Sequence, residues 1–174
     1  PVFVFSIGLL RIFLEPFISP LGIIQIVLFF YFFISMIFIY KSINILCADR
    51  KISTSLLFLF CLWPFIGISN AIVPGSDYVA IALFSIGTFY MLSNKLHIGA
   101  IFFGFTILAH KAMWPITFFI FLFHFIQFYK NLEIRTVSIN IILYLTPLTI
   151  LWIFGSIHHN NVYWIIESNI KNEL

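Results

Sequence analysis

Long apolar runs separated by short polar connections dominate the chain. The clearest run, residues 21–40, follows Pro20 and contains no charged residue. It matches the roughly 20 residues that a helix needs to cross a bilayer. Five further runs share this apolar character, over residues 56–72, 78–93, 98–109, 116–129 and 137–154. The pattern predicts an all-α, polytopic transmembrane helical bundle with about six spans.

The two ends of the chain differ from the runs between them. Residues 1–14 are apolar but interrupted by Arg11, and the sequence Glu15-Pro16 follows directly. This stretch is too short to cross a bilayer at about 1.5 Å per residue, so residues 1–19 are expected to form an interfacial or re-entrant segment. Residues 155–174 are more polar and are expected to form an external interfacial tail. The whole chain is interpreted as one transmembrane domain, with spans over 21–154.

Two pairs of polar residues mark the connections between the middle runs. Ser76 and Asp77 follow Pro-Gly and are suited to cap the helix over 78–93. Residues 94–97 form a polar turn, after which residues 98–109 are expected to return as a second short helix. His110 and Lys111 close this helical hairpin.

Composition supports lipid rather than water as the main surroundings. The 174 residues are 62% hydrophobic and only 9% charged, whereas a soluble domain carries about 25% charged residues. The chain begins at Pro1 without Met, and we expect it to be a fragment of a longer protein.

The distribution of positive charge predicts an orientation. Nine Lys and Arg residues give a net charge of +3, but they are scattered singly and form no basic stripe for nucleic acid. Assigning connections to alternate sides places six of them on one side, namely Lys41, Arg50, Lys51, Lys95, Lys130 and Arg135. The other side holds Arg11, Lys111 and Lys171. Positive residues concentrate in cytoplasmic loops, so Asp77 and His110 are expected to face outward.

Motifs for soluble-type chemistry are missing from the sequence. It contains no glycine-rich nucleotide loop, no HExxH and no GxSxG. Cys47 and Cys61 suggest neither a disulfide nor a metal framework, and no metal site is predicted.

Three residues on the outer side are the candidates for substrate binding: Asp77, His110 and Lys111. Asp77 either caps a helix or accepts a hydrogen bond from a substrate hydroxyl. Lys111 either snorkels toward the headgroups or binds an anion such as a lipid phosphate. The residues themselves leave both readings open.

The order of these segments resembles the central membrane region of GT-C glycosyltransferases, whose members include aminoarabinose transferases and protein mannosyltransferases. The resemblance covers residues 1–130. It rests on Ser19-Pro20-Leu21, Ile39-Tyr40, Trp63-Pro64, Gly75-Ser76-Asp77-Tyr78, Leu83-Phe84, Gly99-Ala100, Gly104-Phe105 and Ala109-His110-Lys111.

The resemblance implies a multi-pass enzyme of the cell inner (plasma) membrane. Such an enzyme moves a sugar from a polyprenyl-phosphate donor to a glycan, lipid or protein acceptor on the outer face. By this analogy Asp77 and Lys111 line the outer cavity, with Lys111 near the donor phosphate, while a divalent metal is the other source of positive charge. The family's catalytic carboxylate is expected before Pro1, so no catalytic residue is assigned here.

Two other interpretations remain open from the sequence. A polysaccharide polymerase or ligase of the O-antigen type also uses lipid-linked glycans, but a large external loop rich in Arg and His is expected there, and the external turns here are short. A transporter segment or structural subunit is the non-enzymatic alternative. Transporters are expected to show broken helices or intramembrane charges near the midplane.

Overall fold

The computed structural model describes residues 2–47, 51–56, 77–110, 113–128 and 134–159. These residues form helices and the turns between them, and no strand occurs among them. The helices are α1 (Val2–Leu14), α2 (Pro20–Cys47), α6 (Asp77–Leu92), α7 (Leu96–Ala109), α8 (Trp114–Phe128) and α9 (Ile134–His159). A short helical segment also covers residues 51–56. The expected all-α fold is thereby confirmed.

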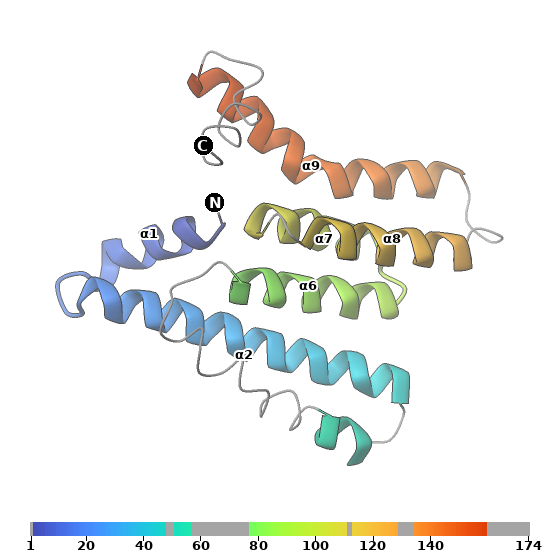
Figure 1. The fold of residues 1–174 in the computed structure, drawn as a ribbon, viewed down its shortest axis with the longest axis horizontal. Helices are drawn as coiled ribbons and strands as arrows, with labels where there is room; N and C mark the ends of the chain where they lie inside the picture. Colours follow the sequence, from blue (N-terminus) through green and yellow to red (C-terminus); the bar gives the residue numbers. More distant parts are fainter. Residues whose placement is uncertain (1, 48–50, 57–76, 111–112, 129–133, 160–174) are drawn as a thin grey trace, which may run out of the picture.

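Four helices follow one another across the molecule in the order α2, α6, α7 and α9 (Figure 1). The helices α6 and α7 form an antiparallel hairpin at the centre, with α2 packed on α6 and α9 packed on α7. The helix α8 lies against α7, and α1 lies along the beginning of α2 (Figure 1). The expected hairpin over 78–109 is therefore present.

Two of the described helices are long and apolar enough to cross a membrane. They are α2, with 28 residues, and the 24-residue stretch Arg135–His158 of α9. At about 1.5 Å per residue they reach about 42 and 36 Å, more than the roughly 30 Å hydrocarbon core. Only 22% of the most apolar part of α2 and 17% of that of α9 is buried. An exposed apolar helix of this length indicates membrane association.

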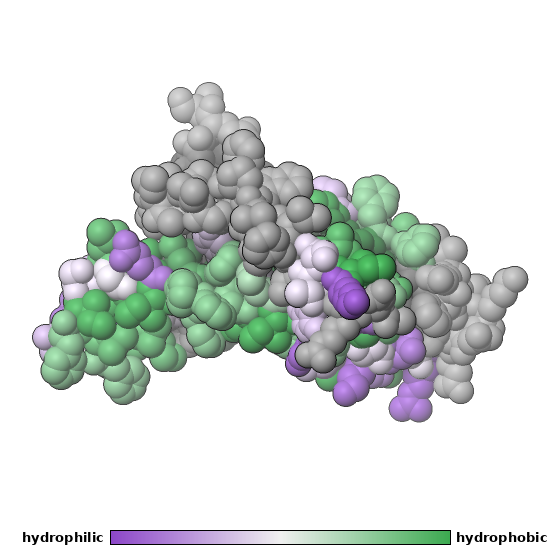
Figure 2. All heavy atoms as spheres, turned by 90° about the horizontal axis from the view of Figure 1, so that it is seen from below, coloured by the Kyte–Doolittle hydropathy of each residue, from purple (hydrophilic) through white to green (hydrophobic). Residues whose placement is uncertain are grey.

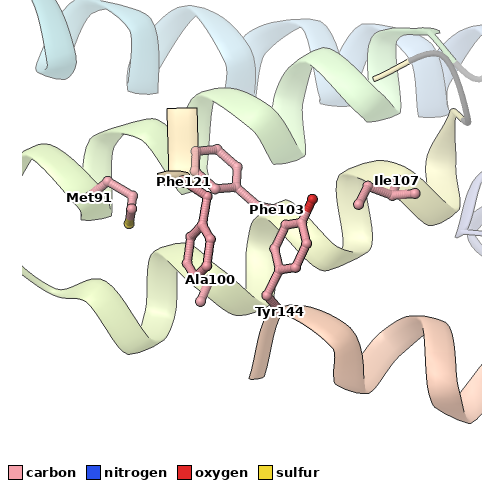
Figure 3. Close-up of a cluster of buried hydrophobic side chains, with 6 residues drawn as sticks. All are labelled: Met91, Ala100, Phe103, Ile107, Phe121 and Tyr144. Carbon is pink, nitrogen blue, oxygen red and sulfur yellow. The ribbon is translucent and has the colours of Figure 1, made fainter. Parts of the chain in front are cut away.

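The central helices are shorter but better covered. With 16 and 14 residues, α6 and α7 have lengths of about 24 and 21 Å. They supply four members of a buried cluster, Met91, Ala100, Phe103 and Ile107, to which α8 adds Phe121 and α9 adds Tyr144 (Figure 3). Phe121 of α8 stacks on Tyr144 of α9 with ring centroids 4.9 Å apart. The shorter helices therefore lie between the longer ones that carry most of the exposed apolar surface.

Some boundaries differ from the sequence-based expectation. The helix α2 continues to Cys47, although residues 41–55 were predicted to be a polar connection. Two interactions let the polar residues remain in the helix. The hydroxyl of Ser42 donates to the carbonyl of Phe38, and the ammonium of Lys41 lies 5.3 and 5.6 Å from the ring centroids of Phe38 and Phe89.

The beginning of the predicted external tail is also helical, because α9 continues past residue 154 to His159. The hydroxyl of Ser156 donates to the carbonyl of Trp152, so this polar side chain is satisfied within the helix. Residues 160–174 of the tail, and residues 57–72 of the predicted span over 56–72, lie outside the described residues.

Asn94 makes the turn between α6 and α7. It is a non-glycine residue with positive φ, at 59°, a conformation that Asn tolerates well. The backbone N–H of Lys95 donates to Tyr90 O and that of Asn94 donates to Met91 O. These bonds satisfy carbonyls at the end of α6 in the manner of a Schellman motif.

Close approach between helices depends on glycine. A Cβ atom on Gly99 would lie 3.1 Å from the carbonyl oxygen of Gly87, so α6 and α7 are nearly in backbone contact. A Cβ on Gly104 would clash with the carbonyl oxygen of Tyr144 and touch the ring of Pro147. Pro147 lies inside α9, which visibly changes direction (Figure 1). A proline within a helix is a usual cause of such a bend.

The two ends of the bundle carry different charges. One end holds Lys41, Lys95 and Arg135, near the α6–α7 turn and the beginning of α9. The opposite end holds Arg11, Glu15, Asp77 and His110. On the face drawn in Figure 2, hydrophilic atoms form separate groups on either side of a hydrophobic stretch. Three of the six Lys and Arg residues that are predicted to lie on one side of the membrane are therefore found at one end of the bundle.

The glycine contact between α7 and α9 gives a first prediction. Gly104→Ala should lower the free energy of unfolding by about 1–3 kcal/mol, because the new methyl group meets backbone that cannot easily move. Gly8→Ala is the matched control, since a Cβ there has no atom within 4 Å. Thermal unfolding of both variants in the same detergent measures the difference. Equal unfolding midpoints would show that the two helices are not in close contact at this position.

Candidate functional site

The candidate site lies where α6 begins and α7 ends. Antiparallel packing brings these two helix ends together, although Asp77 and His110 are 33 positions apart in the sequence. The Nε2 atom of His110 is 3.2 Å from Oδ1 of Asp77. The structure thus brings together two of the three residues predicted from the sequence. Lys111, the third, lies outside the described residues.

Backbone geometry holds His110 in place. It follows α7 in an extended conformation, with φ of −148° and ψ of 115°. Its N–H donates to the carbonyl of Thr106, and its own carbonyl accepts from the N–H of Met113. The backbone of His110 is therefore held through both its N–H and its carbonyl, between the end of α7 and the beginning of α8.

The helix ends favour opposite charges at this site. Asp77 lies in the first turn of α6, where the helix dipole stabilises a carboxylate. His110 directly follows the last turn of α7, where the dipole stabilises a cation. The two ends lie side by side, so each side chain suits both its own helix and its partner.

Both side chains remain accessible. The exposed fractions are 48% for the Asp77 side chain and 39% for that of His110. The pair is therefore open to a ligand and is not a buried structural contact. A charged contact this exposed contributes at most about 1 kcal/mol to the free energy of unfolding. Its effect on stability therefore does little to explain why these two side chains are paired.

A buried apolar cluster lies next to the Asp77–His110 pair. Val79, Ala80 and Leu83 of α6 form a buried cluster with Ala109, which directly precedes His110. Tyr31 of α2 packs against this cluster. The hydroxyls of Tyr31 and Ser6 are 2.7 Å apart, which ties α1 to the same end of the bundle.

A second charged pair lies at the end of α1, with Arg11 in its last turn and Glu15 directly after it. The Arg11 guanidinium is 2.6 Å from the carboxylate of Glu15. The hydrogen bond from Arg11 lowers the pKa of Glu15. Both side chains are about half exposed, so this pair is a surface feature of the predicted interfacial segment.

The arrangement at Asp77 and His110 can bind a polar ligand, but it does not resemble a metal centre. A carboxylate bonded to one imidazole nitrogen fixes the ring and leaves its other nitrogen for a ligand. Hydroxyl groups and phosphate oxygens are suitable ligands for such a pair. Among the described residues, no group of three or more His, Cys, Asp or Glu side chains could hold a metal ion.

A second polar contact, which the sequence pattern does not indicate, lies at the opposite end of α7. Nδ1 of His97 is 2.8 Å from Oδ1 of Asn140 in α9. Asn140 is fully buried, with 0% exposure. The available signal was a lone Asn within the apolar run over 137–154, but its partner is 43 positions away. Only the packing of α7 against α9 reveals it.

Comparison with known proteins identifies no relative. No family model, curated protein or solved structure matches this chain. Function must therefore be argued from the chain's own residues.

The geometry predicts which residues an impermeant reagent can label from the same side of a membrane. In a background with Cys47 and Cys61 replaced by Ser, Asp77→Cys and His110→Cys should react with an impermeant maleimide from one side. Lys95→Cys should react only from the other side, because it lies at the far end of the hairpin. Labelling of intact and permeabilised cells distinguishes the sides. Reaction of Asp77→Cys and His110→Cys from opposite sides would remove the candidate site.

Proposed function

We propose that this chain is a multi-span part of an inner-membrane glycosyltransferase that uses a polyprenyl-phosphate-linked sugar. The observation that carries the proposal is the accessible Asp77–His110 pair, with Nε2 and Oδ1 3.2 Å apart, at the end of the bundle away from Lys41 and Lys95. A site at the membrane surface suits a donor whose chain lies in lipid and whose phosphate lies in the headgroup region.

The charge pattern supports an outward orientation for this site. Cytoplasmic loops are rich in Lys and Arg, and the end with Lys41, Lys95 and Arg135 fits that side. Asp77 and His110 would then face the extracytoplasmic space. The long exposed apolar surfaces of α2 and α9 support a position within the bilayer.

In the proposed reaction, the acceptor hydroxyl loses its proton to a carboxylate and forms a bond to the anomeric carbon of the sugar, while the bond from that carbon to the polyprenyl phosphate oxygen breaks. The leaving phosphate gains negative charge, which nearby cations or hydrogen-bond donors stabilise. Lys111 and an imidazole N–H of His110 would supply these groups, and a divalent metal is an alternative to Lys111. Asp77 would hold the imidazole in position or accept a hydrogen bond from an acceptor hydroxyl. We assign these residues to binding and do not assign the proton acceptor.

Binding of a polyprenyl phosphate to the full chain in neutral-lipid nanodiscs tests the proposal directly. His110→Gln and Asp77→Asn should each weaken binding by about tenfold, the loss expected when one charge-assisted hydrogen bond of about 1.4 kcal/mol is removed. Glu15→Gln is the control, because it removes a half-exposed carboxylate at the same end. Unphosphorylated polyprenol separates binding of the phosphate from binding of the chain.

Two results would contradict the proposal. Equal affinity for the phosphorylated and unphosphorylated lipid would exclude phosphate recognition. Unchanged affinity in both the Asp77→Asn and His110→Gln variants would place recognition elsewhere. Transfer of a radiolabelled sugar from the same donor, measured on whole membranes, then distinguishes an enzyme from a lipid-binding protein.

One pair of observations favours a transporter segment as a second candidate. α9 contains Pro147 within an apolar stretch, and Asn140 of the same helix is fully buried. Interrupted helices and buried polar groups are features of transporter binding sites. In this case solute uptake into vesicles should depend on Asn140, while Asp77→Asn should leave it unchanged.

A further inference from the structure

An apolar groove runs along the contact between α7 and α9. It has a volume of about 340 Å³. Three residues of α7 and three of α9 form most of its walls, namely Ile101, Phe105, Leu108, Leu143, Ile150 and Phe154. Thr146 also lines the groove, but its hydroxyl donates to the carbonyl of Ile142 in its own helix. The groove therefore offers a ligand mainly hydrocarbon surface.

The bend at Pro147 accounts for the groove. At the level of Gly104, α9 lies directly against α7, because a Cβ on that glycine would clash with the carbonyl oxygen of Tyr144. Beyond Pro147, α9 turns away from α7 (Figure 1). Two helices that touch at one level and diverge beyond it leave space between them. Protein interiors leave few voids of this kind, so the groove indicates an occupant from outside the chain.

The two helices run in the same direction. His97 is bonded to Asn140 near the beginning of each helix, and Gly104 approaches Tyr144 further along. The end of α7 and the later part of α9 are therefore at the same level. The groove lies at this level, so it extends toward the end of the bundle that holds His110 (Figure 1).

The length of the groove matches one leaflet of a bilayer. Leu143 lies near the middle of the apolar stretch Arg135–His158, and Phe154 lies near its end. At about 1.5 Å per residue, the groove is about 16 Å long between these two residues. Half of a hydrocarbon core of roughly 30 Å is about 15 Å, which is the depth that the chains of one leaflet occupy.

The rim of the groove belongs to the exposed apolar surface. Phe105, Ile150 and Phe154 all line the groove and are exposed. Hydrocarbon chains cover such a surface in a bilayer, where no water is present to fill the space. The surroundings of the groove, its length and its direction therefore all suit a lipid chain that lies along the helices.

We propose that the α7–α9 groove binds one acyl chain of a membrane phospholipid from the leaflet at the His110 end. The chain would lie between Leu108 and Ile150, with the headgroup beyond Phe154. Helix association in lipid relies on close van der Waals packing, so a chain that fills the groove supports the bent course of α9. This partner is separate from the sugar donor proposed above, and either proposal can fail without the other.

Native mass spectrometry of the full chain, purified in mild detergent and incubated with dipalmitoyl phosphatidylcholine, tests the proposal. Ile150→Trp should retain one phospholipid fewer than the native chain, because the indole occupies the groove. Leu108→Trp, on the opposite wall, should show the same loss. Ile153→Trp is the matched control, since Ile153 is a similarly exposed residue of α9 that does not line the groove.

Two comparisons on the native chain keep the test valid if a groove variant does not fold. Dihexanoyl phosphatidylcholine should not be retained, because its chains are too short to fill the groove. Dipalmitoyl phosphatidylglycerol should be retained as well as the phosphatidylcholine, because hydrocarbon contacts do not distinguish headgroups.

Four results would overturn the proposal. They are equal retention by the native chain and folded groove variants, an equal loss in Ile153→Trp, retention of the short-chain lipid, and retention that depends on the headgroup. Added polyprenyl phosphate should leave the bound phospholipid in place. Displacement of the phospholipid by polyprenyl phosphate would assign the groove to an isoprenoid chain and would also overturn the proposal.

Discussion

Close backbone contact at small residues is the constraint on which this structure depends. Gly99 allows α7 to approach Gly87 of α6, and Gly104 allows it to approach the Tyr144 backbone of α9. In lipid the hydrophobic effect does little to drive helices together, so association relies on such close packing and on hydrogen bonds between helices. Since α7 contacts both α6 and α9 through glycines, it is the central element of the bundle.

The hydroxyl groups show how the fold accommodates polar atoms in an apolar setting. Ser42, Ser85, Thr106 and Thr146 each donate to a carbonyl four residues earlier in their own helix. Such bonds satisfy the side chain without a partner on another helix. Two further contacts join α9 to its neighbours: Thr117 Oγ1 lies 3.2 Å from the Tyr144 hydroxyl, and His97 is bonded to Asn140. They therefore fix the position of α9 relative to α8 and α7.

A single helix, α7, takes part in two polar contacts with its neighbours. His97 lies in the first turn of α7 and contacts α9, whereas His110 directly follows its last turn and contacts α6. The helix dipole gives these ends opposite character, with the beginning suited to anions and the end suited to cations. The His97–Asn140 contact and the Asp77–His110 pair therefore both depend on the position of α7. A shift of α7 along its axis would disturb both contacts together.

The sequence by itself determined the helical class, the hairpin over residues 78–109 and the expectation that Asp77 and His110 face the same side. Apolar run length and turn residues fix these features locally, and an even number of crossings returns the chain to the same side. Only the tertiary structure decided the 3.2 Å contact of Asp77 with His110, the continuation of α2 to Cys47 and the bond between His97 and Asn140. These features depend on which helix faces lie together. With 24 Phe residues distributed over nearly every helix, hydrophobicity marks no single face for packing, so the sequence pattern alone could not select one.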